Sequence, residues 1–588
     1  MAVRKFKAFS EMQEGNRLLL MSLLVGTASG LAAALLSTVI HLLQNLVSIG
    51  LKGPLHPLVY LVFPGLGMLL VMLFVKNVVK DNISHGVTKV LVSVSKKESR
   101  IKPHNMWSSI ATSAVTIGLG GSVGAEAPIV YTGAAIGSNF AKYAGLSHRS
   151  MTILIGCGAA GAVAGIFKAP LAGVLFTLEI LLFNISMTSM MPLLLSTVSA
   201  TVVSYLLLGN ELPFQCTLTP FSMGNIPFYI ILGVVGGLFS VYFIRMTLHL
   251  EDRIGSIGNN FKRWAVCAAG LGLLIFLFPP LYGEGYSSLG ALLNGGTVSI
   301  DESAPMAFLL RSKWGVPLFF LLILLLKVFS MTLTNAGGGV GGTFGPTLFV
   351  GALTGFVVAR VINILLANAG ISVPEQNFVL VGMAALMAGV MQAPMTAIFL
   401  IAEISGGYEL FLPLIIAAAV SFGTTRLFER YSIYTKRIAQ SGELLTHDND
   451  QAVLTLLKTR DLVRDKYPRV NEDMTLGEFV DLISDSEAQV FAVLDEGRRL
   501  VGLVEMDRMR KLMFKTDLYD SLHVSDFMEH PQALVYIDEK MDSVMEKFDK
   551  TEAWRLPVVD ENHIYSGFVS KSRILSAYRL ELKEISQD

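Results

Sequence analysis

The chain has 588 residues, of which 52% are hydrophobic and 16% charged, and its 46 basic and 46 acidic side chains give no net charge. This balance excludes a nucleic-acid-binding protein driven by bulk positive charge, so we expect no nucleic-acid partner. Residues 441–588 contain 19 Lys/Arg and 30 Asp/Glu, about a third of that segment, whereas only a tenth of residues 1–440 is charged. We therefore expect a polytopic protein of the lipid bilayer with a soluble C-terminal domain.

The N-terminal segment, residues 1–16, carries Arg4, Lys5 and Lys7 and runs directly into an apolar stretch of about thirty residues. That stretch is too long for the apolar region of a cleaved signal peptide. We expect the segment to be retained and to lie in the cytoplasm, because basic residues favour that side. With a cytoplasmic C-terminus as well, the chain would cross the plasma membrane several times.

Residues 17–440 form the predicted membrane domain, in which apolar segments recur at short intervals. They lie at about 18–48, 56–78, 106–120, 129–145, 151–187, 190–208, 226–249, 264–281, 315–333, 345–366, 377–404 and 411–428. Several are too short to cross hydrocarbon at ~1.5 Å per residue. Short apolar pieces interrupted by glycine are typical of transporters whose helices break inside the membrane and line a cavity.

An internal duplication relates residues 158–180 to residues 382–404, with eight of 23 positions identical. An Ala-Pro and a Glu-Ile pair recur in one register, which chance agreement between Ala- and Gly-rich helices does not explain. A Gly-rich break ending in proline precedes each copy. We therefore expect two duplicated halves to meet around one pathway, and the similarity leaves open whether they are parallel or inverted.

The two breaks are predicted to bind an anion. GGSVGAEAP at 120–128 precedes an apolar helix expected to start near Pro128, and NAGGGVGGTFGP at 335–346 repeats the arrangement before Pro346. Glycines let an anion approach the unsatisfied N–H groups at the positive end of a helix. Close packing of membrane helices is the alternative explanation for these glycines.

Glu126 lies within the first break, where an ionised carboxylate costs a few kcal/mol unless it has partners or a function. Its charge would occupy the N–H site that a permeating anion needs, and protonation would release that site. Glu126 is therefore a candidate gate and proton acceptor. The alternative is a buried glutamate bonded to backbone donors for structure alone.

Four motifs together resemble the CLC family of chloride channels and chloride/proton antiporters. They are GxxGxExP at 121–128, GGTFGP at 341–346, SHGV at 84–87 and APLAGVLFTLEI at 169–180, and the resemblance covers roughly residues 20–440. It implies an all-α polytopic fold with a CLC-type inverted-repeat helical core over residues 17–440. It also implies a homodimer in which each subunit has its own pathway for chloride and, in antiporters, for protons.

The resemblance assigns Glu126 as the external gating glutamate. It places the anion-binding groups at His85, Gly86, Gly124, Gly342, Thr343, Phe344, Gly345 and Tyr434. The Tyr434 hydroxyl would face the central anion, since a hydroxyl donor on an apolar ring suits a weakly hydrated halide. The alternative for Tyr434 is an aromatic anchor at the membrane interface.

His85 departs from the family pattern, because it occupies the place of the central serine. It can donate an N–H to an anion, and its charge can vary near neutral pH, so selectivity between halides and nitrate is open. The alternative is a structural, hydrogen-bonded histidine. Ala125 and Ala127 replace the common arginine and glycine beside the gate.

Ile180 aligns with the position at which many antiporters carry an inner proton-transferring glutamate, and it cannot titrate. This favours uncoupled or weakly coupled chloride flux, with a chloride/proton antiporter as the alternative. For the neighbouring Glu179 we favour a structural polar contact over a proton-transfer role.

The C-terminal tail contains a second duplication, VLDEGRRLVGLVEMDR at 493–508 against VVDENHIYSGFVSKSR at 558–573. After a linker at 441–473, residues 474–588 resemble a tandem pair of CBS domains with α/β structure. Such pairs commonly bind adenine nucleotides. The ribose-binding carboxylate is replaced by Arg508 in one copy and Arg573 in the other, so Ser570 is the only matching residue. We therefore expect no bound cofactor, with an adenine nucleotide bound at the pair as the alternative.

A CBS-regulated cation transporter is a remote alternative, disfavoured because residues 1–440 carry only 16 acidic side chains. An intramembrane enzyme is not expected, because no His/Glu metal pair, GxSxG or aspartate pair is found. The cysteines, Cys157, Cys216 and Cys267, lie far apart and predict neither a zinc site nor a disulfide.

Overall fold

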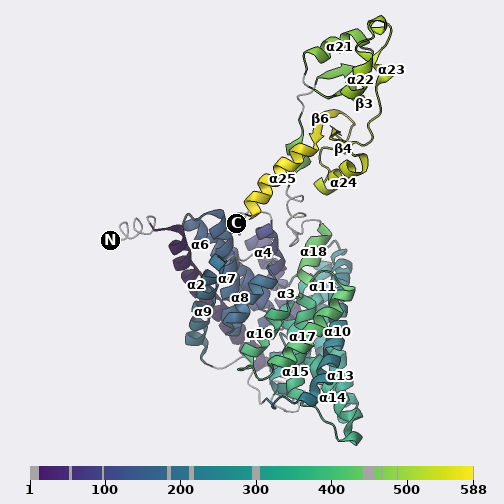
Figure 1. Cartoon of the computed structure of the whole chain (residues 1–588). Helices are drawn as coiled ribbons and strands as arrows, with labels where there is room; N and C mark the ends of the chain where they lie inside the picture. Colours follow the sequence, from purple (N-terminus) through teal and green to yellow (C-terminus); the bar gives the residue numbers. More distant parts are fainter. Residues whose placement is uncertain are drawn as a thin grey trace. The chain divides into compact units, whose positions relative to one another are not determined.

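The computed structural model divides into two compact units, Met1–Leu444 and Leu445–Asp588, and each is considered by itself (Figure 1). The residues described are 12–51, 56–95, 99–181, 187–210, 218–293, 305–441, 457–464, 468–486 and 488–586. Cys216, which enters the cysteine argument, lies outside them.

The first unit is built of helices, with no strand in the ranges described. In its N-terminal half these are α2 (Glu14–Leu51), α3 (His56–Phe74), η1 (Val75–Val79), α4 (Gly86–Ser95), α5 (Asn105–Gly118), α6 (Glu126–Tyr143), α7 (His148–Phe167), α8 (Pro170–Glu179) and α9 (Met187–Leu208). In its C-terminal half they are η2 (Met223–Asn225), α10 (Ile226–Gly255), α11 (Asn260–Leu277), η3 (Pro279–Leu281), α12 (Tyr286–Leu293), η4 (Ala307–Arg311), α13 (Gly315–Ala336), α14 (Phe344–Leu365), η5 (Ala367–Ala369), α15 (Glu375–Met391), α16 (Pro394–Ile404), α17 (Phe411–Phe428) and α18 (Ile433–Ser441).

Nine helices among the described residues are long and apolar enough to cross a membrane. Three further apolar helices, α8, α15 and α16, have only 10–17 residues. They correspond to parts of two long predicted segments, 151–187 and 377–404, each of which the structure divides into two helices. Large hydrophobic side chains stay exposed on several of the long helices, for example Leu35 on α2, Leu66 on α3 and Leu206 on α9. Such surfaces suit contact with lipid, and the prediction of a polytopic membrane protein is confirmed.

The duplicated Ala-Pro pairs form matching helix junctions. Lys168 follows the last residue of α7 and Gln392 that of α15, both with positive φ (56° and 53°). Pro170 and Pro394 then open α8 and α16 at the first helical position. Proline suits that position, because its missing N–H needs no partner there and its φ is already helical. The repeated sequence thus produces the same sharp turn twice.

Close helix packing also recurs in both halves. A Cβ on Gly133 of α6 would overlap the carbonyl of Gly158 on α7, and the reverse holds for Gly158. In the same way, a Cβ on Gly351 of α14 would overlap the carbonyl of Gly382 on α15, and a Cβ on Gly382 would overlap that of Gly351. Glycine at these four positions therefore brings each pair of helices into backbone contact.

The ends of α8 and α16 are joined by reciprocal carboxylate contacts. Glu179 accepts from the Met395 and Thr396 amides at 3.0 and 2.6 Å and from the Thr396 hydroxyl at 2.7 Å. Glu403 accepts from the Leu171 and Ala172 amides at 3.0 and 2.9 Å. Each carboxylate thus satisfies the free N–H groups at the start of the other helix, a structural contact of the kind favoured for Glu179.

The second unit contains two three-stranded sheets with the orders β1-β2-β3 and β4-β5-β6. The first repeat comprises α20 (Thr459–Leu462), β1 (Arg469–Asn471), α21 (Leu476–Ser484), β2 (Val490–Leu494), β3 (Leu500–Glu505), α22 (Met506–Leu512) and η6 (Thr516–Leu518). The second comprises α23 (Val524–Phe527), β4 (Val535–Tyr536), α24 (Met541–Thr551), β5 (Arg555–Val559), β6 (Tyr565–Ser570) and α25 (Lys571–Ser586).

The two repeats share one topology, in which the first strand pairs parallel with the second and the second pairs antiparallel with the third. β1 lies in the stretch that the sequence assigned to a linker, so the folded unit begins before residue 474. Three residues were too few for a hydrophobic period to reveal this strand.

Glu539, just before α24, holds the second repeat together through several hydrogen bonds. It accepts from Lys547, from the Ser543 hydroxyl at 2.6 Å and from the Tyr536 amide at 3.0 Å. Burial opposes the charged form, but the hydrogen bonds and the Lys547 charge outweigh it and lower the pKa of Glu539. The carboxylate therefore favours the folded state most when it is ionised.

Candidate functional site

The two Gly-rich breaks meet in the interior of the membrane unit. Gly124 and Gly342 form an antiparallel bridge, with amide-to-carbonyl distances of 3.0 and 2.7 Å. α6 begins directly after the first break and α14 directly after the second, so two helix N-termini start beside each other. Such N-termini attract an anion, because their first N–H groups lack partners within the helix.

The starts of both helices differ from the sequence prediction by two residues. α6 begins at Glu126 rather than near Pro128, and α14 begins at Phe344 rather than at Pro346. Both prolines lie in the first turn, where the missing N–H breaks no helical hydrogen bond. Glu126 is therefore itself the first helical residue of α6.

The Glu126 carboxylate is buried, with 3% of the residue exposed, and lies against the second helix start. Its Oε1 accepts from the Tyr286 hydroxyl at 2.6 Å, and its Oε2 accepts from the Gly345 amide at 3.2 Å. Gly124 makes room for it, because a Cβ there would overlap Oε2. The carboxylate thus accepts a hydrogen bond from the Gly345 amide, a donor at the second break, where the sequence predicted that an anion binds.

Tyr434 is buried within the unit, so its ring is not exposed as that of an interfacial anchor would be. It is 4% exposed, and its hydroxyl accepts a hydrogen bond from the Thr343 hydroxyl at 3.3 Å. Since Thr343 directly precedes α14, the phenol lies at the same helix start as Gly345. The Tyr434 hydroxyl keeps its own proton as a donor for a second acceptor.

Phe344 and Gly86 shape this region through packing. The Phe344 ring lies 5.5 Å from the Phe167 ring between centroids and 6.2 Å from that of Phe176. Gly86 opens α4, and a Cβ there would lie 2.6 Å from the Ala127 carbonyl oxygen of α6. The glycine therefore lets the N-terminus of α4 approach α6.

His85 precedes α4 in a left-handed backbone conformation, with φ 56°. Its Nδ1 lies 3.0 Å from Nη1 of Arg437, which belongs to α18, the helix that carries Tyr434. Arg437 also forms an ion pair with Glu251 of α10. The structure brings His85 together with a cation that the sequence argument did not consider.

Three further polar residues beside the gate were missed by sequence reasoning. The Glu284 carboxylate accepts from the Ala125 amide at 3.0 Å, and Tyr286 bonds to Glu126 as above. Lys327 of α13 is fully buried, and its ammonium donates to the Ser122 hydroxyl at 2.8 Å and to the Gly283 carbonyl at 2.9 Å. The cost of burying charge would have identified Lys327, the only charged residue in the apolar segment 315–333.

Ile180 follows the last residue of α8 and is buried, with 3% of the residue exposed. Its aliphatic side chain can neither accept nor donate a proton. Glu179, beside it, is committed to the amides at the start of α16.

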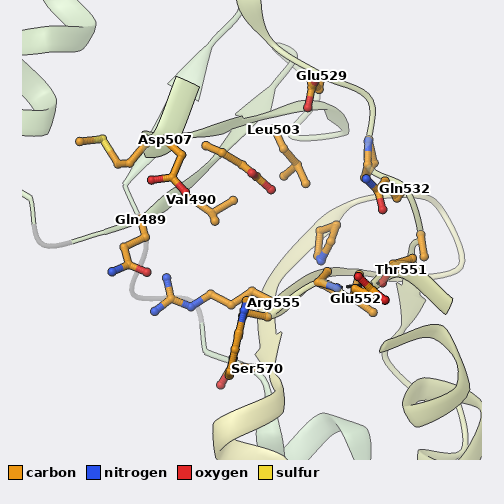
Figure 2. Close-up of a pocket in the computed structure, with 18 of the residues that line it drawn as sticks. Gln489, Val490, Leu503, Asp507, Glu529, Gln532, Thr551, Glu552, Arg555 and Ser570 are labelled. Atoms are coloured by element: carbon orange, nitrogen blue, oxygen red, sulfur yellow. Dashed lines mark hydrogen bonds between the residues drawn. The ribbon is translucent and has the colours of Figure 1, made fainter. Parts of the chain in front are cut away.

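The second unit contains a cavity of about 680 Å³ between its two repeats (Figure 2). Ser570 lies on its wall, and the Ser570 hydroxyl accepts from the Arg573 amide at 3.3 Å at the start of α25. The charged side chains of the lining are Glu505, Asp507, Glu529, Glu552, Arg510 and Arg555. Four acids against two arginines do not suit a polyphosphate. The Arg508 side chain lies outside the described part of the structure.

Comparison with known proteins places both units in families. A family model described as voltage gated chloride channel matches residues 67–426, and a CBS domain model matches residues 460–515 and 524–580. Chloride channel protein CLC-e of Arabidopsis thaliana is 27% identical over 430 residues, which cover 68% of this chain and 58% of the relative. The H(+)/Cl(−) exchange transporter ClcA of Vibrio cholerae is 25% identical over 439 residues, covering 71% and 88%. The chain spans just over half the length of the plant relatives.

Two solved structures share the fold. A slow cyanobacterial Cl−/H+ antiporter superposes with a TM-score of 0.60 at 21% identity, covering 72% of this chain and 98% of the antiporter. A eukaryotic CLC transporter gives a TM-score of 0.60 at 17% identity, covering 95% and 98%. The superpositions show the fold alone, and with the two family models they confirm the predicted helical core with a CBS pair.

Proposed function

The chain belongs to the voltage-gated chloride channel family, and we propose that it moves chloride across a membrane along a pathway gated by the protonatable carboxylate of Glu126. The observation that carries this proposal is the contact between Glu126 Oε2 and the Gly345 amide at the start of α14. An anionic side chain there competes with chloride for the same donor. Protonation removes the charge and frees the donor, so acid opens the pathway.

The anion would be held by neutral donors rather than by a cation. The backbone of the second break, from Gly342 to Gly345, offers amides at a helix start, and the Tyr434 hydroxyl lies beside Thr343. Gly124 and Gly86 keep the neighbouring backbones close enough to enclose the site. Neutral N–H and O–H donors bind chloride weakly enough to release it again, as conduction requires.

We favour uncoupled or weakly coupled flux, because the buried Ile180 cannot relay a proton from the inner side. A chloride/proton antiporter is the alternative, supported by the similarity to the ClcA exchanger and by a buried carboxylate able to take up a proton. The two differ in one measurable property, which is proton movement driven by a chloride gradient.

The remaining features of the proposal concern assembly and location. We place the protein in the plasma membrane as a homodimer with one pathway per subunit and with both termini in the cytoplasm. The CBS pair would act there without a bound nucleotide, since acids dominate its cavity.

Chloride efflux from liposomes tests the gate. Wild-type protein should release chloride faster at pH 4.5 than at pH 7.5, whereas Glu126→Gln should release it at one rate at both pH values, because no charge then competes with the anion. Efflux that stays strongly dependent on pH in Glu126→Gln would contradict the assignment. A folded Glu126→Gln that carries no chloride would make the residue structural or obligatory rather than a gate.

A further inference from the structure

A histidine where the anion pathway needs a neutral donor raises the question of its protonation state. His85 is half-buried, and its carbonyl accepts the Lys89 amide at 3.2 Å, so it lies at the N-terminus of α4. Its φ of 56° is left-handed, a conformation that is uncommon outside glycine but that histidine adopts more often than most residues.

The contact with Arg437 determines which ring nitrogen carries the proton. A guanidinium has only N–H donors and stays charged at every relevant pH. At 3.0 Å from Arg437 Nη1, the His85 Nδ1 must therefore be the acceptor. A neutral imidazole that accepts at Nδ1 carries its hydrogen at Nε2. A second proton would place N–H against N–H and two positive charges in contact.

Glu251 keeps Arg437 in this position. The second guanidinium nitrogen, Nη2, forms an ion pair with Glu251 Oε2, and each of these side chains is 16% exposed. The guanidinium thus uses one nitrogen on the carboxylate of α10 and the other on the imidazole before α4. A planar fork of this kind holds its two partners in fixed directions.

The other charged groups near His85 are engaged elsewhere. The Lys89 ammonium on α4 bonds to the Asn82 side chain at 3.2 Å, and Asp81 pairs with Lys102 and His104. Lys436, the neighbour of Arg437 on α18, pairs with Glu429. From α6 the side chain nearest this helix start is Tyr131, which is neutral. No carboxylate within the described ranges bonds to His85, so nothing there compensates an imidazolium.

We infer that Arg437 is a positioning residue that locks His85 as a neutral Nε2–H donor for the permeating anion, and that Glu251 holds Arg437 for this task. The inference rests on the proposed chloride pathway and deepens it. Nε2 has no hydrogen-bond partner among the described residues, so its N–H is available to a halide. A locked neutral ring would also mean that the charge of His85 does not vary near neutral pH, contrary to one of the two expectations from the sequence. His85 then adds no charge of its own to the pathway as the pH falls.

The tautomer is measured directly by 15N NMR of histidine-labelled full-length protein. Subtracting the spectrum of His85→Asn isolates His85 from the other nine histidines. We expect the Nε2–H signature of a neutral ring from pH 8 to pH 5.5. A signal from protonated Nδ1 in this range would overturn the inference, whether or not the protein carries chloride.

The consequence for transport is tested in a Glu126→Gln background, which lacks the outer pH sensor. Adding Arg437→Met should release the tautomer and remove a positive neighbour of His85, so that a second proton is taken up more readily than in the presence of Arg437, although burial of the ring still opposes the charge. The half-saturating chloride concentration should then fall about fivefold or more from pH 8 to pH 5.5, because a positive charge joins the site. Arg437→Lys, which still donates to Nδ1, should keep the flat profile.

A third substitution assigns the new pH dependence to its source. His85→Asn, added to Arg437→Met and Glu126→Gln, should abolish it. A 15N spectrum of Arg437→Met that still shows the single Nε2–H tautomer, with transport intact, would overturn the inference. Absence of chloride transport in the wild type would instead refute the proposed function and leave the NMR result standing. If Arg437→Met does not fold, Glu251→Gln provides the test, and its spectrum should show loss of the single tautomer.

Discussion

Removing the Tyr286 hydroxyl should weaken the binding of the Glu126 carboxylate at the Gly345 amide, the proposed anion site. Tyr286 donates to Glu126 Oε1 at 2.6 Å, and this is one of two hydrogen bonds that fix the carboxylate against Gly345. A hydrogen bond to a charged group contributes about 1.5–3 kcal/mol. Its loss in Tyr286→Phe corresponds to a roughly 10- to 150-fold change in the ratio of gate-bound to gate-free states.

Since the proposed gate competes with chloride, we expect the half-saturating chloride concentration at pH 7.5 to fall by up to that factor. At pH 4.5, where Glu126 is protonated and does not compete, Tyr286→Phe should match the wild type. Chloride titration of the efflux rate at both pH values measures the effect.

A neighbouring tyrosine supplies the control. The Tyr282 hydroxyl is buried and has no hydrogen-bond partner in the described part of the chain, so Tyr282→Phe should leave the chloride dependence unchanged. In a Glu126→Gln background Tyr286→Phe should also have no further effect, because the charge it stabilises is gone. An equal shift in Tyr282→Phe, or a shift that persists in the double variant, would refute the competition between gate and anion.

Three further predictions concern coupling, ligand binding and stability. Ile180→Glu should add proton uptake driven by a chloride gradient if only the inner relay is missing, whereas no gain with normal chloride flux would place the difference elsewhere in the pathway. Isothermal titration of the full-length protein with ATP, ADP and AMP should show little binding, and micromolar affinity for any of them would contradict an acidic, nucleotide-free cavity. Glu539→Gln should lower the thermal stability of the CBS unit at pH 7, because a lowered pKa stabilises the fold above the unfolded value of about 4.3 and the contribution fades as pH falls below it. Glu546→Gln, which breaks an exposed pair with Lys550, should change nothing, and an equal loss there would refute a specific role for Glu539.

The sequence predicted the features that repeat or that carry an uncommon cost. Two Ala-Pro pairs in one register indicated matching helix junctions, and the structure forms both after Lys168 and Gln392. Glu126 stood out as a candidate site residue, because a carboxylate buried in an apolar break requires partners or a function. Glycine at 124 and 342 placed the two breaks at helix starts, which lie side by side.

Contacts between distant segments were beyond the reach of sequence reasoning. Tyr286 lies 160 residues from Glu126 and Arg437 lies 352 from His85, and no periodicity connects such pairs. The sequence therefore left His85 as either an anion donor of variable charge or a structural histidine, and did not reveal its contact with Arg437. Lys327 was within reach, since a lone lysine in an apolar span demands a polar partner, here Ser122 and the Gly283 carbonyl.

The central claim is that this chain conducts chloride and that Glu126 controls access to the site at α14. The most direct measurement is ion efflux from liposomes containing the wild-type protein, recorded at pH 4.5 with a chloride gradient and, separately, with gradients of potassium and magnesium. We expect chloride efflux that slows at pH 7.5 and no movement of either cation. Transport of a divalent cation without chloride would contradict it.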